Sequence, residues 1–344
     1  MSKNSSRTAY LFLATVVIVS SGAFYYHYHT RSEPHQCSYE DPKICEDECV
    51  NGNLLSCFHL AELYYSGKGK EQDYQLAKHY HQINCFRGHS SSCARLVNWY
   101  QAGIGVNKSS EISNFFLEES CRLNDYQMCF ELAQKIAKEG TEHLVESLSF
   151  HEKACKGNFE ASCQNLFTAR QKLLEQCENN NYQSCYHLGM LYSQGIGLTT
   201  DFELATTYFR IACRENISAS CNQMGMMFQL PQKEFLDLEK ASRLFQKACE
   251  AQNAHGCENL GLMYYNGEGV TQDLKKSVDL FGKACLLQSG KGCFYAGYVY
   301  APQEKVSALT DQEKSLEYYK KSCEFGYGSG CFNLAYLYHD SKNS

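Results

Sequence analysis

Cysteine, small and aromatic residues recur along most of the chain at the spacing of one helix face. In one unit they are Cys185, Gly189 and Tyr192, at positions i, i+4 and i+7, which lie on the same side of a helix. The turn Gly195–Gly197 follows, and a second amphipathic stretch, Phe202–Cys213, then ends at the next cysteine. Each unit therefore predicts a helix A, a glycine turn and a helix B. The small residues are Ala61, Ala133, Gly189, Gly225, Gly261, Gly297 and Ala335, and the aromatic ones Tyr64, Tyr100, Tyr192, Phe228, Tyr264, Tyr300 and Tyr338.

This unit repeats with an almost fixed period. The first cysteines of successive pairs stand at 49, 85 and 121, and again at 177, 213, 249 and 285, which are steps of 36 residues. A period of this length is typical of a solenoid, in which each repeat buries its apolar face against its neighbours. We therefore expect an all-α fold, an α-solenoid of helix-turn-helix repeats.

The 20 cysteines fall into pairs whose members are eight residues apart. The first member ends helix B and the second opens the next helix A, so the two antiparallel helix ends can approach within the Cα separation of a disulfide, roughly 4.4–6.8 Å. Zinc is disfavoured because its ligands usually stand two to four residues apart, and free thiols are the other alternative. The predicted bridges are Cys37–Cys45, Cys49–Cys57, Cys85–Cys93, Cys121–Cys129, Cys155–Cys163, Cys177–Cys185, Cys213–Cys221, Cys249–Cys257, Cys285–Cys293 and Cys323–Cys331.

The register breaks once. Only 13 residues separate Cys163 from Cys177, where a normal unit has 27, and Arg170 stands where the aromatic residue is expected. We expect one continuous helix there, roughly from Ala161 to Glu178, which would hold the two cysteines about 21 Å apart. The chain would then divide into a first solenoid arm (45–165), a fused-helix junction (166–178) and a second arm (179–344). The alternative is a distorted unit without a change of path.

The N-terminus predicts export from the cytoplasm. Residues 1–8 carry Lys3 and Arg7 and would stay in the cytoplasm, residues 9–26 form an uncharged run, and residues 27–44 form a linker. The run is long enough for a transmembrane anchor, and cleavage after Ala23 would make it a signal peptide instead; a buried N-terminal helix is a third interpretation. Retention is slightly favoured, so we expect a periplasmic protein anchored to the inner membrane, or a secreted one. So many cysteines also favour an oxidising compartment.

Composition and motifs exclude several functions. The 344 residues carry a formal net charge of −6, which gives no basic footprint for nucleic acid. The serine β-lactamase strings Ser-x-x-Lys, Ser-Asp-Asn and Lys-Thr-Gly are absent. His79 and His81 stand two apart on a predicted helix and cannot chelate one ion together. We therefore expect no metal, no cofactor and no catalytic residue.

The repeated pattern resembles a known family. Leu188-Gly189-Met190-Leu191-Tyr192 and Leu260-Gly261-Leu262-Met263-Tyr264, each followed by a glycine turn and a cysteine-ended helix, are similar to the Sel-one-like repeat, a relative of the tetratricopeptide repeat. With a cysteine pair in each unit, the chain resembles the Helicobacter cysteine-rich protein family over about residues 45–344. This resemblance implies a binding scaffold. It also implies an alternative, a β-lactam-binding protein with weak β-lactamase activity, and a purely structural spacer is the third interpretation.

The resemblance further implies which residues face the concave side. In such stacks helix A builds the concave wall, and the position five after the second cysteine faces the groove. These residues are Glu62, Asn98, Gln134, Met190, Met226, Leu262, Tyr298 and Tyr336. Methionine and tyrosine suit an adaptable protein-binding surface, although core packing would explain the apolar members equally. We expect a scaffold outside the cytoplasm that binds a protein, a peptide or an envelope component in this groove.

Overall fold

The chain folds into a series of short antiparallel helices. A computed structural model describes residues 37, 41–231, 236–301 and 309–340, and these contain helices and no strand. The predicted all-α fold is confirmed. The described residues fall into two compact units, which divide between Leu123 and Asn124. The predicted division into arms at the junction 166–178 stays a prediction, and the predicted membrane segment 9–26 lies outside the described residues.

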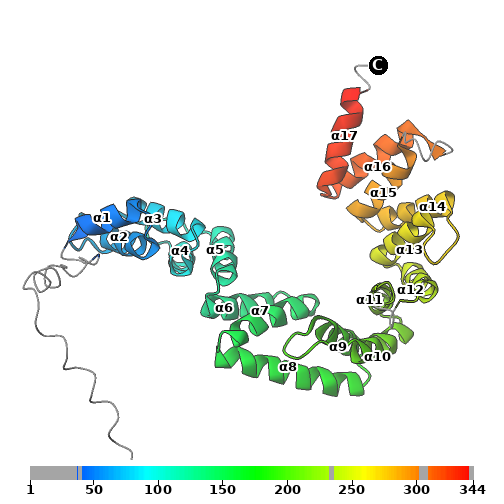
Figure 1. Cartoon of the computed structure of the whole chain (residues 1–344), viewed down its shortest axis with the longest axis horizontal. Coiled ribbons are helices and arrows are strands. Elements are labelled where there is room, and N and C mark those ends of the chain that lie inside the picture. Colours follow the sequence, from blue (N-terminus) through cyan, green and yellow to red (C-terminus); the bar gives the residue numbers. More distant parts are fainter. Residues whose placement is uncertain (1–36, 38–40, 232–235, 302–308, 341–344) are drawn as a thin grey trace, which may run out of the picture. The chain divides into compact units, whose positions relative to one another are not determined.

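Unit 1 contains α1 (Pro42–Val50), α2 (Leu54–Ser66), α3 (Tyr74–Phe86), α4 (Ser90–Ala102) and α5 (Ser110–Arg122). Unit 2 contains α6 (Tyr126–Ile136), the 3₁₀ turn η1 (Thr141–His143), α7 (Leu144–Lys156), α8 (Glu160–Glu178), α9 (Tyr182–Gln194), α10 (Phe202–Arg214), α11 (Ser218–Met227), α12 (Leu238–Glu250), α13 (Ala254–Asn266), α14 (Leu274–Leu286), α15 (Gly290–Tyr300), α16 (Gln312–Glu324) and α17 (Gly328–Asp340). Figure 1 labels the α-helices along the chain.

Local signals set where each helix begins and ends. Helix B starts after a capping aspartate in several repeats; Asp201, for example, accepts a hydrogen bond from the Leu204 amide, which satisfies one of the open N–H groups of the first turn. Helix A ends in several repeats at a glycine in the left-handed region, such as Gly195 with φ 72°. Glycine is the residue that adopts this conformation without a steric penalty.

A buried aromatic ring packs on a glycine inside each of three successive hairpins. Phe245 of α12 is fully buried, and a methyl group added at Gly225 of α11 would come within 2.6 Å of its ring. Gly189 meets Phe209 and Gly261 meets Phe281 in the same way. The small residue predicted on helix A therefore exists because the ring of helix B occupies the space of its side chain.

Disulfides join the end of helix B to the start of the next helix A, except for Cys37–Cys45, which joins a residue before α1 to α1 itself. The structure joins nine of the ten predicted pairs, all with a sequence separation of eight and with Cα atoms 4.5–4.9 Å apart. Cys121 and Cys129 are disulfide-bonded as well. At every such corner in the described residues, the residue three after the first cysteine has a positive φ, as Gly88, Asn158 and Gln252 do.

The register break contains one uninterrupted helix, α8, which Figure 1 shows as a single long ribbon between α7 and α9. Its length of 19 residues agrees with the predicted fusion. Leu166 contacts the turn glycine Gly197, as the first residue of α12, Leu238, contacts Gly269. The part of α8 from Leu166 to its end therefore corresponds to a complete helix B, and only the first turn of helix A precedes it. The rest of helix A and its turn are missing.

None of the helices in the described part of the chain is long and apolar enough to cross a membrane.

Candidate binding surface

The predicted concave residues all reach solvent to some degree. Met226, Tyr298 and Tyr336 are 45%, 38% and 63% exposed, and Asn98 and Gln134 are exposed as well. The remaining three, Glu62, Met190 and Leu262, are half-buried. All eight lie on A helices. Glu62, Asn98 and Gln134 are polar, and the five residues from α9 onward are methionine, leucine or tyrosine.

In unit 1 the predicted residue Glu62 is already engaged within the protein. Its carboxylate accepts hydrogen bonds from Arg95 Nε and an Arg95 terminal nitrogen at 2.7 and 2.8 Å, and His81 Nε2 lies 3.2 Å from its Oε1. Burial alone would raise the pKa of Glu62, but His81 and the Arg95 charge bring that pKa below its ordinary value. The Arg95 guanidinium also lies over the Tyr65 ring, 5.9 Å from its centroid.

A buried serine and histidine extend this network. Ser92 Oγ lies 3.4 Å from His81 Nδ1 and accepts a hydrogen bond from Asn84, and burial lowers the pKa of His81. The order serine, histidine, glutamate is that of a nucleophile, base and acid. Ser92 is fully buried, however, and this serine and histidine pairing recurs in another repeat without the acid. The arrangement therefore packs and orients the core rather than presenting a nucleophile.

That second pair is Ser162 with His151, whose Oγ and Nδ1 lie 3.2 Å apart. Each histidine stands four residues before the cysteine that ends helix B, and each serine one residue before the next cysteine. Sequence reasoning missed the pairs, although their common register with the cysteines would have revealed them.

In unit 2 aromatic rings gather on the A helices. We call Tyr265, Phe294, Tyr298, Phe332 and Tyr336 of α13, α15 and α17 the aromatic surface. Tyr298 contacts the rings of Tyr265 and Phe294, with centroids 6.3 and 6.2 Å apart. Phe332 and Tyr336 are 71% and 63% exposed on α17. So much exposed aromatic area on neighbouring helices is typical of a protein-binding site.

The sequence predicted only part of this surface. Phe294 and Phe332 stand four residues before the predicted positions Tyr298 and Tyr336, so they share their helix faces. Applying the helical period once more would have found them. A buried glutamate, Glu258, occupies the equivalent position on α13. Burial raises its pKa, but hydrogen bonds with His255 and Ser289 outweigh that effect and lower it.

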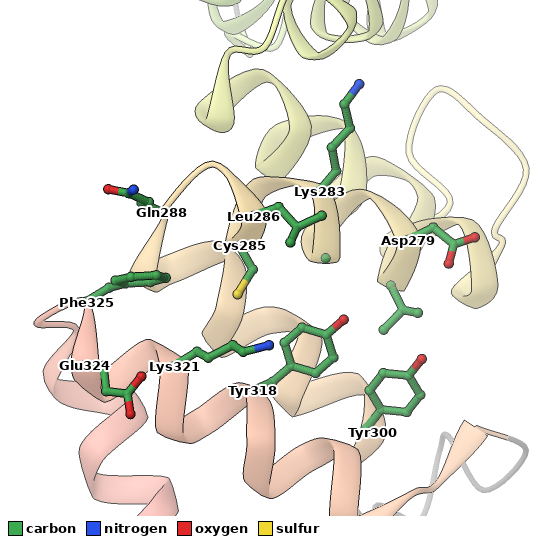
Figure 2. A pocket seen from close by; sticks show the side chains of 12 residues that line it. Asp279, Lys283, Cys285, Leu286, Gln288, Tyr300, Tyr318, Lys321, Glu324 and Phe325 are labelled. Carbon is green, nitrogen blue, oxygen red and sulfur yellow. The ribbon is translucent and has the colours of Figure 1, made fainter.

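A cavity of about 590 Å³ lies between the B helices α14 and α16. Figure 2 shows Lys321 extending toward Tyr318, with Tyr300 beside it, while Lys283 and Gln288 point away. Gly282 gives the cavity room, since a methyl group there would lie 3.1 Å from the Tyr318 hydroxyl. Lys321 is paired with Glu317 at 2.6 Å, and the lining mixes acidic and basic side chains. These charges indicate no particular ligand.

No group of three histidine, cysteine, aspartate or glutamate side chains in the described residues could hold a metal ion. The predictions that the protein uses no metal, no cofactor and no catalytic residue are not tested by this observation and stay predictions.

Comparison with known proteins gives a family match. The model of the Sel1 repeat family matches residues 54–83, 90–125, 183–217, 218–253, 254–289, 290–327 and 328–343, which is more than half of the chain. Residues 126–182, which contain α8, fall outside the match. No curated protein matches the sequence.

Among solved structures, the chain is similar to c5321, a protective antigen of uropathogenic Escherichia coli with an SLR fold, at 22% identity and a TM-score of 0.43. That alignment covers 87% of this chain and 59% of the antigen, so the chain spans somewhat more than half of that relative's length. A Sel1 repeat protein of Oxalobacter formigenes gives 17% identity, a TM-score of 0.42 and coverage of 87% and 80%. Helicobacter pylori cysteine-rich protein B is 27% identical with a TM-score of 0.31, and the alignment covers 38% of this chain and 93% of that protein.

Proposed function

Since the chain belongs to the Sel1 repeat family, whose members act as scaffolds for protein interactions, we propose that its aromatic surface binds a segment of another protein. One observation carries this proposal: Phe332 and Tyr336 expose 71% and 63% of their surface on one face of α17, a helix that adjoins α15. Burying such rings under a partner removes apolar area from water, which contributes about 25 cal/mol per Å².

The disulfides support two parts of the proposal, the cellular compartment and the preorganisation of the binding surface. So many bridges indicate an oxidising environment outside the cytoplasm. The finer location, in the periplasm with residues 9–26 as an anchor or after cleavage behind Ala23, is part of our proposal. Bridged corners hold the A helices in place before a partner arrives. Less conformational freedom is then lost on binding, which favours affinity.

Crosslinking in intact cells followed by affinity capture tests the proposal. Phe332→Ser combined with Tyr336→Ser should abolish capture of a specific partner while leaving the far-ultraviolet circular dichroism unchanged. Tyr338→Ser is the matched control, because Tyr338 is also an aromatic residue of α17 and is 54% exposed. It stands seven residues after Cys331, on a different face of the helix from Phe332 and Tyr336. Equal capture by the double variant and the wild type would refute the aromatic surface as the binding site.

A further inference from the structure

A second cavity lies where the fused helix replaces a hairpin. This junction cavity has a volume of about 430 Å³ and is lined by α7, α8 and the turn after α9. Its floor is apolar: Leu148, Leu166, Leu191 and Ile196 are all at most 9% exposed and belong to one core cluster. The volume lies within the range of small-molecule sites, about 300–1,000 Å³. Because the missing part of helix A would belong here, the cavity follows directly from the fusion.

The rim of the junction cavity carries an uncompensated positive charge. Glu152 and Lys156 both line the cavity and pair with each other at 2.7 Å, so their charges cancel. Arg170 lines the same cavity; among the described residues it has no ion-pair partner, and it lies over the Phe167 ring at 5.7 Å from the centroid.

Phe167 differs from the residues at the same position of most other repeats. It stands ten residues before the cysteine that ends its helix, and 59% of its surface is exposed. From α3 onward, the other repeats have polar or charged residues there: Gln75, Glu111, Glu203, Glu239, Lys275 and Glu313, with Val145 as the exception. In those repeats the position lies in the first helical turn, where an acidic side chain is favourable. In α8 it lies in mid-helix, and an aromatic ring borders the cavity instead.

We propose that the junction cavity binds a small amphipathic carboxylate, an apolar chain or ring that ends in one carboxylate group. The apolar part would lie on Leu148, Leu166 and Ile196, and the carboxylate would accept hydrogen bonds from the Arg170 guanidinium. Charge complementarity carries this assignment, because a lone guanidinium beside an apolar cavity favours a single anionic group attached to an apolar body. The site is separate from the aromatic surface, so either proposal can fail without the other.

Titration with octanoate, followed by methyl resonances of isotope-labelled leucine and isoleucine, tests this site. Saturable shifts should be confined to the leucine and isoleucine residues that line the cavity, which are Leu148, Leu166, Leu191, Ile196 and Leu198. The variant Arg170→Gln should weaken octanoate binding about tenfold or more, since a hydrogen bond to a charged group contributes roughly 1.5–3 kcal/mol. Lys172→Gln is the matched control: it removes an equal charge from an exposed position of the same helix that does not line the cavity.

Two further measurements distinguish the contribution of the carboxylate charge to binding from the contribution of the apolar cavity. Octan-1-ol, which has the same chain length without the carboxylate, should bind at least tenfold more weakly than octanoate and be insensitive to Arg170→Gln. Phe167→Glu, which introduces the residue found in other repeats, should weaken octanoate binding by placing a negative charge beside Arg170. Absence of saturable shifts, equal affinity for octanoate and octan-1-ol, or equal effects of Arg170→Gln and Lys172→Gln would each overturn the proposal.

Discussion

Two groups of repeats fill the same core position with different chemistry. Four residues before the cysteine that ends helix B, the hairpins α2–α3 and α6–α7 have His81 and His151, whereas α9–α10, α11–α12 and α13–α14 have Phe209, Phe245 and Phe281. The small position on helix A changes with it: glycine packs on the phenylalanines, and the histidine repeats have Ala61 and Ala133 at the same register position. The core therefore keeps its total volume by a paired exchange, which is how interiors tolerate substitution.

The histidine repeats and the phenylalanine repeats also differ in the hydrogen-bond partners of the core side chain and in the residue at the disulfide-bridged corner. Each buried histidine lies beside a serine hydroxyl, while the phenylalanine repeats need no such partner. The corners after α12 and α14 carry Gln252 and Gln288 in the left-handed region, whereas the corner after α10 carries Asn216 and the histidine repeats have Gly88 and Asn158 there. The histidine repeats thus depend on hydrogen bonds, and the phenylalanine repeats on close packing.

Replacing the glycine that packs on a buried phenylalanine should have the largest effect on stability. Gly225→Ala places a methyl group 2.6 Å from the Phe245 ring, and overpacking of this kind costs about 1–3 kcal/mol. Hydrogen exchange of the α11–α12 amides should accelerate accordingly. Adding Phe245→Leu, which restores space, should recover much of the loss. A Gly225→Ala variant as stable as the wild type would mean that the paired exchange does not govern the core.

Lowering the pH should destabilise the histidine hairpins α2–α3 and α6–α7 more than α11–α14, by less than the effect of Gly225→Ala. Burial lowers the pKa of His81 and of His151; Glu62 opposes this at His81 and Arg95 adds to it. The unfolded chain has the ordinary pKa near 6.5, so below about pH 6.5 it binds more protons than the folded chain, and stability falls.

Hydrogen exchange corrected for its intrinsic pH dependence should show this between pH 7.5 and 5.5. The α2–α3 and α6–α7 hairpins should open more readily at the lower pH, and α11–α14 should not. There the pKa of His255 is raised by its hydrogen bond with Glu258, so its contribution is present below about pH 6.5 and is lost as the pH rises through the folded pKa. Burial also lowers the pKa of His89 and of His187, so the response is read only from the α3 and α7 amides. A response of those amides that survives His81→Leu, His89→Leu and His151→Leu combined would contradict this origin.

The smallest effect concerns the corners. Gln252 has φ 60°, a region that costs a residue with a side chain roughly 1 kcal/mol, and glycine removes that strain while adding freedom to the unfolded chain. Gln252→Gly should therefore stabilise the protein by at most about 1 kcal/mol, measured by urea denaturation under oxidising conditions. Gly88→Gln should have the opposite sign, and a loss of stability in both variants would show that the corner strain is not relieved by glycine.

The periodic part of the sequence predicted the fold well, because each repeat encodes its own start, turn and end. Asp201, Gly195 and the cysteine pairs are local signals, and even the fused helix α8 followed from counting 13 residues between Cys163 and Cys177. The candidate surfaces were harder to predict. Whether Phe332 is exposed, or whether Glu62 is held by Arg95, depends on contacts between neighbouring repeats, which no single repeat specifies.

The short separation within each cysteine pair has a consequence for biosynthesis. As the polypeptide emerges from a ribosome or a translocation channel, the two thiols of one corner appear together, before those of the next. Oxidation in order of appearance then gives the native connectivity at every step, and no thiol has to wait for a distant partner. Maturation of this protein should need an oxidant but little help from an isomerase that reshuffles wrong bonds.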